Sequence, residues 1–177
     1  MNDKVQVEYL ADISVDAELD QDLRNLLSSC FKKPQDHVFK DRRYFKDPYQ
    51  HRWVIKNEVG ALVAHVGVHN KIVEAGEYRY KIGGIAEVCV LPEYRGHGYV
   101  RSILNDIHQW MEENKLDFAM LFGKTDIYSS SGYVATNNLT GTDATTGKRI
   151  SMHSMIRPIS TKTWPTDIDV HLIGNKF

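Results

Sequence analysis

The sequence predicts a mixed α/β (α+β) fold, in which a mostly antiparallel central sheet is flanked by helices. Three observations support this prediction. β-rich segments separated by short turns follow one another from His51 to Leu91. A long amphipathic stretch then leads directly into the apolar segment LDFAMLF, and turn-rich segments separate the remaining strands. Because a strand–helix–strand crossover joins parallel strands, we expect one parallel pair within the sheet.

The N-terminal third is expected to hold one strand and one helix. The segment VQVEYL is the first strand, and residues 20–31 form a helix with apolar side chains at helical spacing. These side chains are Leu23, Leu26, Leu27 and Cys30. The charged and aromatic segment that follows, up to residue 50, is interpreted as a loop with one short helix.

Three strands are expected next. RWVIKN and ALVAHVGVHNKIV are joined by a hairpin turn at residues 57–60, and AGE forms a second turn. The segment YRYKIGGIAEVCVL is the third strand, which we expect to be interrupted at Gly83 and Gly84.

The C-terminal half begins with an amphipathic helix and then returns to strands. The apolar stripe of this helix consists of Val100, Ile103, Leu104, Ile107, Trp110 and Met111. LDFAMLF reads as a buried strand, and KTDIYSSS as helical turns that end at Gly132. YVAT and ISMHSMIRPI are strands reversed by the turn-rich segment 137–148, and residues 164–177 are expected to add an edge strand.

Length and charge exclude several classes of protein. The chain has 177 residues, 42% of them hydrophobic, so we expect residues 1–177 to form a single domain. Its 22 Lys plus Arg balance 23 Asp plus Glu, which gives no basic patch for nucleic acid and no attraction to an acidic membrane. Two cysteines make no disulfide framework, and no segment is long and apolar enough for a bilayer. A cytoplasmic protein is therefore expected.

The segment VLPEYRGHGYVRSIL combines the end of a strand, a glycine turn and the start of a helix. The N–H groups at a helix N-terminus attract phosphate, and Gly96 and Gly98 let the backbone form an anion-binding nest. Arg95 adds a cation whose planar fork suits phosphate oxygens. A dinucleotide fingerprint is excluded because Arg101 stands where its third glycine is required, and no P-loop lysine is present. By itself a Gly-x-Gly turn also fits an ordinary tight turn.

This segment resembles the acyl-CoA-binding motif of the GCN5-related N-acetyltransferases (GNAT), Arg/Gln-x-x-Gly-x-Gly/Ala. Arg95, Gly98 and Val100 occupy its defined positions, although Val100 replaces the usual Gly or Ala. The resemblance implies a GNAT-like sheet whose parallel strands splay apart around acetyl-CoA, the co-substrate. It also implies that main-chain groups of Cys89 and Val90 pair with the pantetheine arm. The N–H groups implied to hold the pyrophosphate belong to Arg95, Gly96, His97, Gly98, Tyr99 and Val100.

A second segment, YSSSGY, is similar to the family's Tyr-x-x-x-Gly-aromatic ending. The resemblance implies that the Tyr128 hydroxyl lies near the CoA sulfur, where it is the candidate proton donor to the departing thiolate. The Asn that many members carry shortly before this Tyr is absent. The run from Tyr99 to Tyr133 also resembles the branch that holds the aminoglycoside 2′-N-acetyltransferases and the nodulation acyltransferases.

Acetyl transfer to an amine also needs a group that removes a proton from ammonium. Glu87 is the only carboxylate in the expected cofactor strand, and we take it as the candidate base. Strict alternation points its side chain away from the acceptor, unless a bulge in the strand changes the alternation. Pairing with a nearby Arg or Lys is the alternative role. No metal is expected, since the spacing of His65 and His69 in a strand does not make the helical pair of a zinc site.

The sequence therefore predicts an N-acetyltransferase that moves an acetyl group from acetyl-CoA to a small-molecule amine by direct attack in a ternary complex. Three alternatives stay open: a protein or peptide N-acetyltransferase, a longer-chain acyltransferase, and a non-catalytic acyl-CoA sensor. The apolar C-terminal strands would permit a homodimer.

Overall fold

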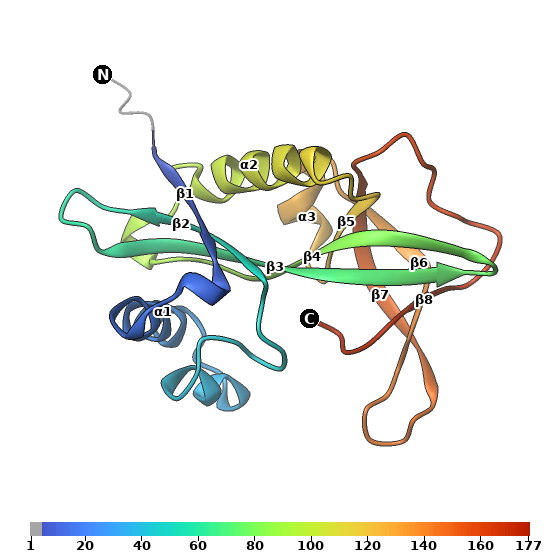
Figure 1. Cartoon of the computed structure of the whole chain (residues 1–177), viewed down its shortest axis with the longest axis horizontal. Helices are drawn as coiled ribbons and strands as arrows, with labels where there is room; N and C mark the ends of the chain where they lie inside the picture. Colours follow the sequence, from blue (N-terminus) through green and yellow to red (C-terminus); the bar gives the residue numbers. More distant parts are fainter. Residues whose placement is uncertain (1–4) are drawn as a thin grey trace. The chain divides into compact units, whose positions relative to one another are not determined.

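The computed structural model describes residues 5–177 and contains eight strands and three α-helices in that range. The strands are β1 (Val7–Ala11), β2 (His51–Lys56), β3 (Leu62–Ala75), β4 (Tyr78–Val90), β5 (Phe118–Leu121), β6 (Val134–Thr142), β7 (Arg149–Pro158) and β8 (Val170–Leu172). The helices are α1 (Ala17–Cys30), α2 (Tyr99–Glu113) and α3 (Thr125–Tyr128), with 3₁₀ turns η1 (Asp12–Ser14), η2 (Pro34–Lys40), η3 (Pro92–Tyr94) and η4 (Ser129–Ser131). This mixed, mostly antiparallel architecture confirms the predicted fold class (Figure 1).

The strands are hydrogen-bonded in the order β1-β2-β3-β4-β5-β7-β6-β8, with a further pairing of β8 to β3. The chain divides into two compact units. Among the described residues, the first contains residues 5–68 and 87–107, and the second contains residues 69–86 and 108–177. The strands β3 and β4 and the helix α2 contribute residues to both units. The expectation of one domain over residues 1–177 stays a prediction.

In the first unit, β1, β2 and β3 form an antiparallel sheet that α1 covers (Figure 1). Leu23, Leu26 and Leu27 are fully or almost fully buried and share a core with Val54 and Cys89. The helix begins earlier than the expected residue 20, because Asp16 caps it. The Asp16 carboxylate accepts a hydrogen bond of 2.9 Å from the main-chain N–H of Leu19.

In the second unit, β4 and β5 form the parallel pair that the crossover predicts. Residues 82–85 of β4 pair with residues 118–121 of β5, and β7 adds to β5 in the antiparallel sense. The last strand, β8, is not a simple edge strand, since it pairs parallel with β6 and antiparallel with β3. The β6–β8 pair is a second parallel pair, which the sequence did not predict.

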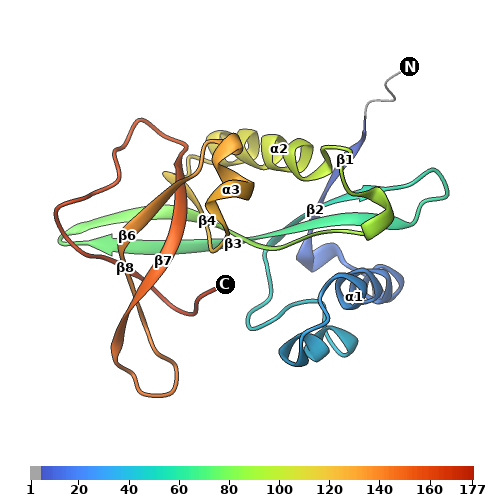
Figure 2. The same ribbon diagram turned by 180° about the vertical axis from the view of Figure 1, so that it is seen from behind.

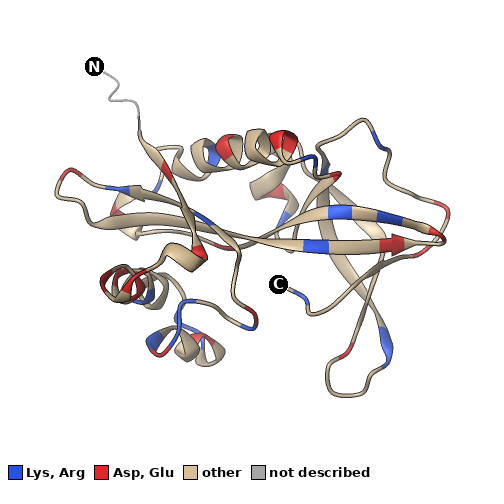
Figure 3. Ribbon diagram, in the orientation of Figure 1, with Lys and Arg blue, Asp and Glu red and all other residues tan. Residues whose placement is uncertain are grey.

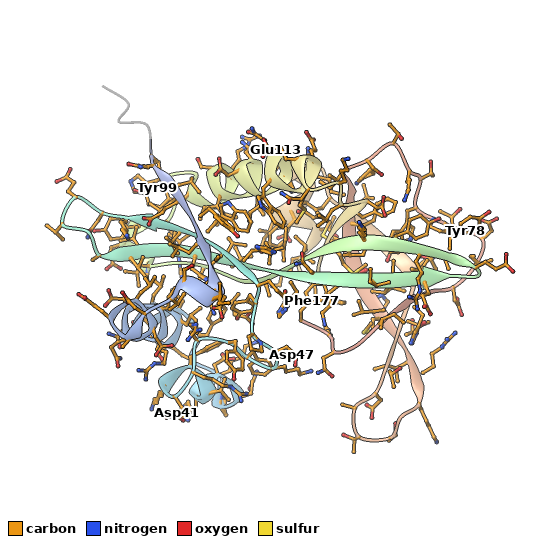
Figure 4. All side chains as sticks on the ribbon, in the orientation of Figure 1. Asp41, Asp47, Tyr78, Tyr99, Glu113 and Phe177 are labelled. Carbon is orange, nitrogen blue, oxygen red and sulfur yellow. The ribbon has the colours of Figure 1, made fainter. Side chains whose placement is uncertain are left out.

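The expected interruption of β4 at Gly83 and Gly84 is wrong, because the strand runs unbroken through both residues. The absence of a side chain at these two glycines instead leaves space for neighbouring side chains to pack against β4. A Cβ atom at Gly84 would lie 2.8 Å from the ring of Phe177, which is labelled in Figure 4. A Cβ atom at Gly83 would collide with the side chain of Met111 on α2. Each glycine therefore marks a close approach of another side chain to the strand.

The expected turn over residues 137–148 is also too long. β6 continues to Thr142, and only Asp143–Lys148 reverse the chain, at the tip of the β6–β7 hairpin (Figure 2). The Asp143 carboxylate closes this tip by accepting hydrogen bonds from the main-chain N–H groups of Thr145 and Thr146.

Figure 3 shows acidic and basic positions distributed over both the helices and the strands. Among the described residues, no helix has the length and hydrophobicity needed to cross a membrane.

Candidate active site

The C-terminal end of β4 continues beyond its pairing with β5. That pairing stops at Ile85, whereas the strand runs on to Val90. The N–H of Leu91 donates to the carbonyl of Val63 on β3. Because main-chain groups alternate along a strand, those of the preceding residue, Val90, point toward the edge of β4 that faces away from β3. The Val90 carbonyl accepts a hydrogen bond of 3.1 Å from Nε of Arg95, which ties the following loop to the strand.

The loop between β4 and α2 is built on two left-handed glycines. Gly96 has a φ of 78° and Gly98 a φ of 76°, which side-chain-bearing residues rarely adopt. A Cβ atom at either position would meet nothing within 4 Å, so backbone conformation rather than space demands glycine here. The side chain of Arg95 is exposed, as is His97 between the two glycines.

The main-chain N–H groups that open α2 have no side-chain cap among residues 5–177. Among the described residues, no side chain accepts a hydrogen bond from the N–H groups of residues 96–100. Val100, the second residue of the helix, is half-buried. This arrangement of uncapped amides, a nearby guanidinium and left-handed glycines has the chemistry of an anion-binding nest.

The loop is held in shape by aromatic and histidine contacts. Nδ1–H of His97 donates to the carbonyl of Tyr94 at 3.1 Å, and the rings of Tyr94 and Tyr99 stack with centroids 6.4 Å apart. Nδ2 of Asn57, in the β2–β3 hairpin, donates to the Tyr94 hydroxyl at 3.1 Å. Tyr99 lies at the start of α2 (Figure 4). Its ring packs against that of Tyr94, and the contact of His97 with the Tyr94 carbonyl gives His97 a role in loop shape.

Glu87 lies in the same unit as this loop and has an unusual main chain. Its φ is 43°, a left-handed conformation within β4 that breaks the alternation on which the sequence argument relied. Oε2 of its carboxyl is buried, and burial raises the pKa of this group. The Tyr49 hydroxyl and the Arg52 guanidinium oppose this rise, whereas the negative charge of Asp36 adds to it.

Cys89 is buried on β4 and close to Cys30 at the end of α1. An interaction with the Cys30 thiol, together with burial, raises the pKa of Cys89 well above its ordinary value. A thiol in that state is protonated at neutral pH, so Cys89 is unsuited to act as a nucleophile.

Tyr128, the candidate proton donor, belongs to the second unit, where it ends α3. Its ring packs against Gly123, at which a Cβ atom would lie 2.8 Å from Cδ2 of the tyrosine. It also meets the ring of Tyr133 edge-on, with centroids 6.2 Å apart. Burial raises the pKa of Tyr128, which keeps its hydroxyl protonated and able to donate.

Two groups of residues near the candidate side chains were missed by the sequence analysis. In the second unit, Nε2 of the buried His108 and the hydroxyl of Tyr133 are 2.7 Å apart, and burial lowers the pKa of His108 to about 4. In the first unit, Arg52 and His65 form a buried polar pair next to Glu87. In the sequence, the local signals of these two pairs are a histidine within the apolar stripe of a helix, His108, and an arginine within a β-rich segment, Arg52.

Among the described residues, no group of three or more His, Cys, Asp or Glu side chains could hold a metal ion. A parallel strand pair joined by a crossover helix, with two left-handed glycines where that helix begins, is the arrangement expected of a GNAT-type acyltransferase fold. The comparisons identify the family. Residues 4–135 match the acetyltransferase (GNAT) domain family, and the chain belongs to it.

Solved structures show the same fold. The GNAT family N-acetyltransferase YhbS from Escherichia coli, in complex with CoA, is 16% identical, and the match covers 97% of this chain and 92% of YhbS with a TM-score of 0.66. A probable N-acyltransferase from Enterococcus faecalis is 19% identical with a TM-score of 0.61. That match covers 76% of this chain but only 33% of the Enterococcus protein. A GNAT family acetyltransferase from Brucella melitensis, in complex with acetyl-CoA, is 14% identical with a TM-score of 0.56, and the match covers 74% and 84% of the two chains. A comparison with curated proteins found no match.

Proposed function

We propose that this protein is an acetyl-CoA-dependent N-acetyltransferase that acts on a primary amine of a small molecule. The observation that carries the proposal is the loop from Arg95 to Gly98, which presents left-handed glycines, and amides that no side chain of residues 5–177 caps, at the start of α2. Membership of the acetyltransferase family supports it, as do the CoA and acetyl-CoA complexes of the YhbS and Brucella structures.

The residues of the loop fit a diphosphate. The amides of residues 96–100 and the exposed guanidinium of Arg95 would hold the pyrophosphate, and the open space beside both glycines leaves room for its oxygens. The main-chain edge at Val90 would pair with the pantetheine arm. A thioester bound in this way supplies an activated acetyl group and a thiol leaving group.

Two side chains are proposed to move protons. Glu87 would accept a proton from the ammonium group of the acceptor, and its raised pKa brings the carboxyl closer to the pH at which an effective base works. The nearby Asp36 adds negative charge that suits a cationic acceptor. Tyr128 would donate a proton to the departing sulfur, a role for which its protonated hydroxyl is suited.

The first experiment measures thermal stabilisation of the protein by acetyl-CoA, CoA and ATP. We expect stabilisation by acetyl-CoA and CoA but not by ATP, since a ligand that binds the folded state raises its melting temperature. Absence of any response to acetyl-CoA or CoA would refute the proposal.

The second experiment follows release of free CoA thiol across a panel of polyamines, aminoglycosides, amino acids and peptides. Turnover with a small amine supports the proposed acceptor class, and turnover with peptides alone would replace it with a peptide acceptor. The aminoglycoside members of the panel also test the predicted relationship to the aminoglycoside 2′-N-acetyltransferases. Stabilisation by acetyl-CoA without transfer to any acceptor would favour a non-catalytic sensor.

A further inference from the structure

The main chain at Glu87 is held in an unfavourable conformation. A non-glycine residue in the left-handed region costs about 1–2 kcal/mol, so the surrounding structure must stabilise it. The described contact that does so comes from a side chain on β3. Nδ1 of His65 lies 2.9 Å from the carbonyl oxygen of Glu87.

The protonation state of His65 follows from its two partners. Its other ring nitrogen, Nε2, lies 3.1 Å from a terminal nitrogen of Arg52. A guanidinium only donates hydrogen bonds, so Nε2 accepts and the proton resides on Nδ1, which faces the carbonyl. His65 is completely buried, and this burial together with the charge of Arg52 lowers its pKa to about 3. The ring is therefore neutral across the physiological range.

Arg52 is itself fixed in place. It is completely buried, its Nε donates to Asp12 at 2.7 Å, and another nitrogen donates to the carbonyl of Arg43 at 2.8 Å. Its guanidinium also lies over the ring of Tyr49, 4.5 Å from the centroid. Tyr49 in turn packs directly onto Gly67, where a Cβ atom would lie 2.8 Å from the ring.

We propose that His65 is a positioning residue for Glu87, and that its Nδ1–H tautomer, selected by Arg52, holds the main chain of Glu87 in the conformation that directs the carboxyl. The inference rests on the proposed function only in taking Glu87 as the base. His65 does not act as the base itself, because it is buried and both of its ring nitrogens are engaged.

The test compares two substitutions of similar size. His65→Asn keeps an N–H donor close to the position of Nδ1, whereas His65→Leu keeps volume and removes the donor. The groups that act on the Glu87 carboxyl, namely Tyr49, Arg52 and Asp36, are unchanged in both variants. If His65→Leu does not fold, His65→Gln takes its place, because its longer amide reaches the Nε2 position and leaves the carbonyl without a donor.

The first readout is independent of activity. The side-chain carboxyl carbons of glutamate, labelled with ¹³C, are titrated by NMR, and the Glu87 signal is assigned by its loss in Glu87→Gln. We expect an elevated pKa of Glu87 in the wild type and in His65→Asn, and in His65→Leu a fall of this pKa toward the ordinary value of about 4.3. In the same sample, ¹⁵N shifts of His65 are expected to report a neutral Nδ1–H ring that does not titrate above pH 4.

The second readout is the pH dependence of kcat/KM for acetyl transfer. In His65→Leu we expect kcat to fall at least tenfold, with the acidic limb shifted to lower pH and KM for acetyl-CoA nearly unchanged. His65→Asn should recover most of kcat and the original limb.

The outcomes separate the inference from the proposed function. An unchanged Glu87 pKa in His65→Leu, or equal losses in the Asn and Leu variants, would overturn the positioning role and reduce His65 to a packing residue. A wild-type protein that transfers acetyl to no amine would instead refute the proposed function, and the NMR titration would still decide whether His65 controls Glu87.

Discussion

The anion-binding loop can be tested at Gly98, where the effect of a substitution on backbone conformation can be separated from its effect on packing. In Gly98→Ala the new methyl group meets no atom within 4 Å, so the substitution introduces no collision. The cost comes from the φ of 76°, and an alanine held there loses about 1 kcal/mol once the lower entropy of its unfolded chain is included. For a chain of this length we expect the melting temperature to fall by about 2–4 °C.

The effect on acetyl-CoA should be larger than the effect on stability. At a ligand concentration of 100 times Kd, wild-type protein gains about 2.7 kcal/mol from binding. A methyl group in the loop displaces the diphosphate or shifts the loop, and a tenfold weaker Kd in Gly98→Ala would remove about 1.4 kcal/mol of that gain. Scanning fluorimetry with and without acetyl-CoA measures both quantities, and isothermal titration calorimetry gives Kd directly.

Gly147 provides a matched control. It has a φ of 67° in the β6–β7 turn, and a Cβ atom there also meets nothing within 4 Å. Gly147→Ala should therefore lose similar stability and keep the wild-type affinity for acetyl-CoA. If Gly98→Ala binds acetyl-CoA as tightly as Gly147→Ala does, the assignment of the loop to the pyrophosphate is refuted.

Three further predictions concern single side chains. Burial raises the pKa of Glu87, so the folded state loses stability as pH rises from the unfolded pKa near 4.3 through the folded value. Above this pH range, Glu87→Gln should therefore melt at a higher temperature than wild type, whereas at pH 3.5 the two melting temperatures should match. The variant should also lose acetyl transfer. A difference in melting temperature that stays the same at every pH would contradict the raised pKa. Tyr128→Phe should lower kcat about 10²–10³-fold with Kd for acetyl-CoA within twofold, measured by thiol release and calorimetry, and an equal loss of both would remove its role as proton donor. Because the thiol interaction raises the pKa of Cys89 and lowers that of Cys30, iodoacetamide at pH 8 should label Cys30 first, as peptide mass spectrometry would show, and prior labelling of Cys89 would contradict the described burial.

The fold was predictable where local pattern and tertiary structure agree. The amphipathic helix α2 is followed directly by an apolar strand, and this order predicts a crossover connection between two parallel neighbouring strands. The structure contains this parallel pair, β4 and β5. The loop before α2 was predictable for a different reason. A left-handed main-chain conformation in an exposed loop favours glycine, so the two glycines Gly96 and Gly98 predict left-handed conformations at their own positions.

Elements stabilised by distant contacts were not predictable. The segment after residue 136 has the composition of a turn, yet β6 continues through it because Asn138 is engaged by the C-terminal segment. Its Nδ2 donates to the carbonyl oxygens of Pro165 and Ile168, and its Oδ1 accepts from the indole of Trp164. Both parts of this contact lie in the second unit, about thirty residues apart in the chain, and no local pattern reports such a pairing.

The orientation of the Glu87 side chain could not be predicted from the sequence for a related reason. Glycine marks a left-handed residue only where the side chain is dispensable, as at Gly96 and Gly98. At Glu87 the proposed chemistry requires a carboxyl group, so glycine is not an option, and the conformational cost must be met by contacts elsewhere. A neutral hydrogen bond such as that from His65 contributes about 0.5–1.5 kcal/mol, which is comparable to the cost of about 1–2 kcal/mol of the left-handed conformation. Glu87→Gly should accordingly be no less stable than wild type while it loses transfer, because it relieves the backbone and removes the base. If Glu87→Gly is instead strongly destabilised in thermal unfolding, the side chain of Glu87, rather than the hydrogen bond to its carbonyl, holds this part of β4 in place.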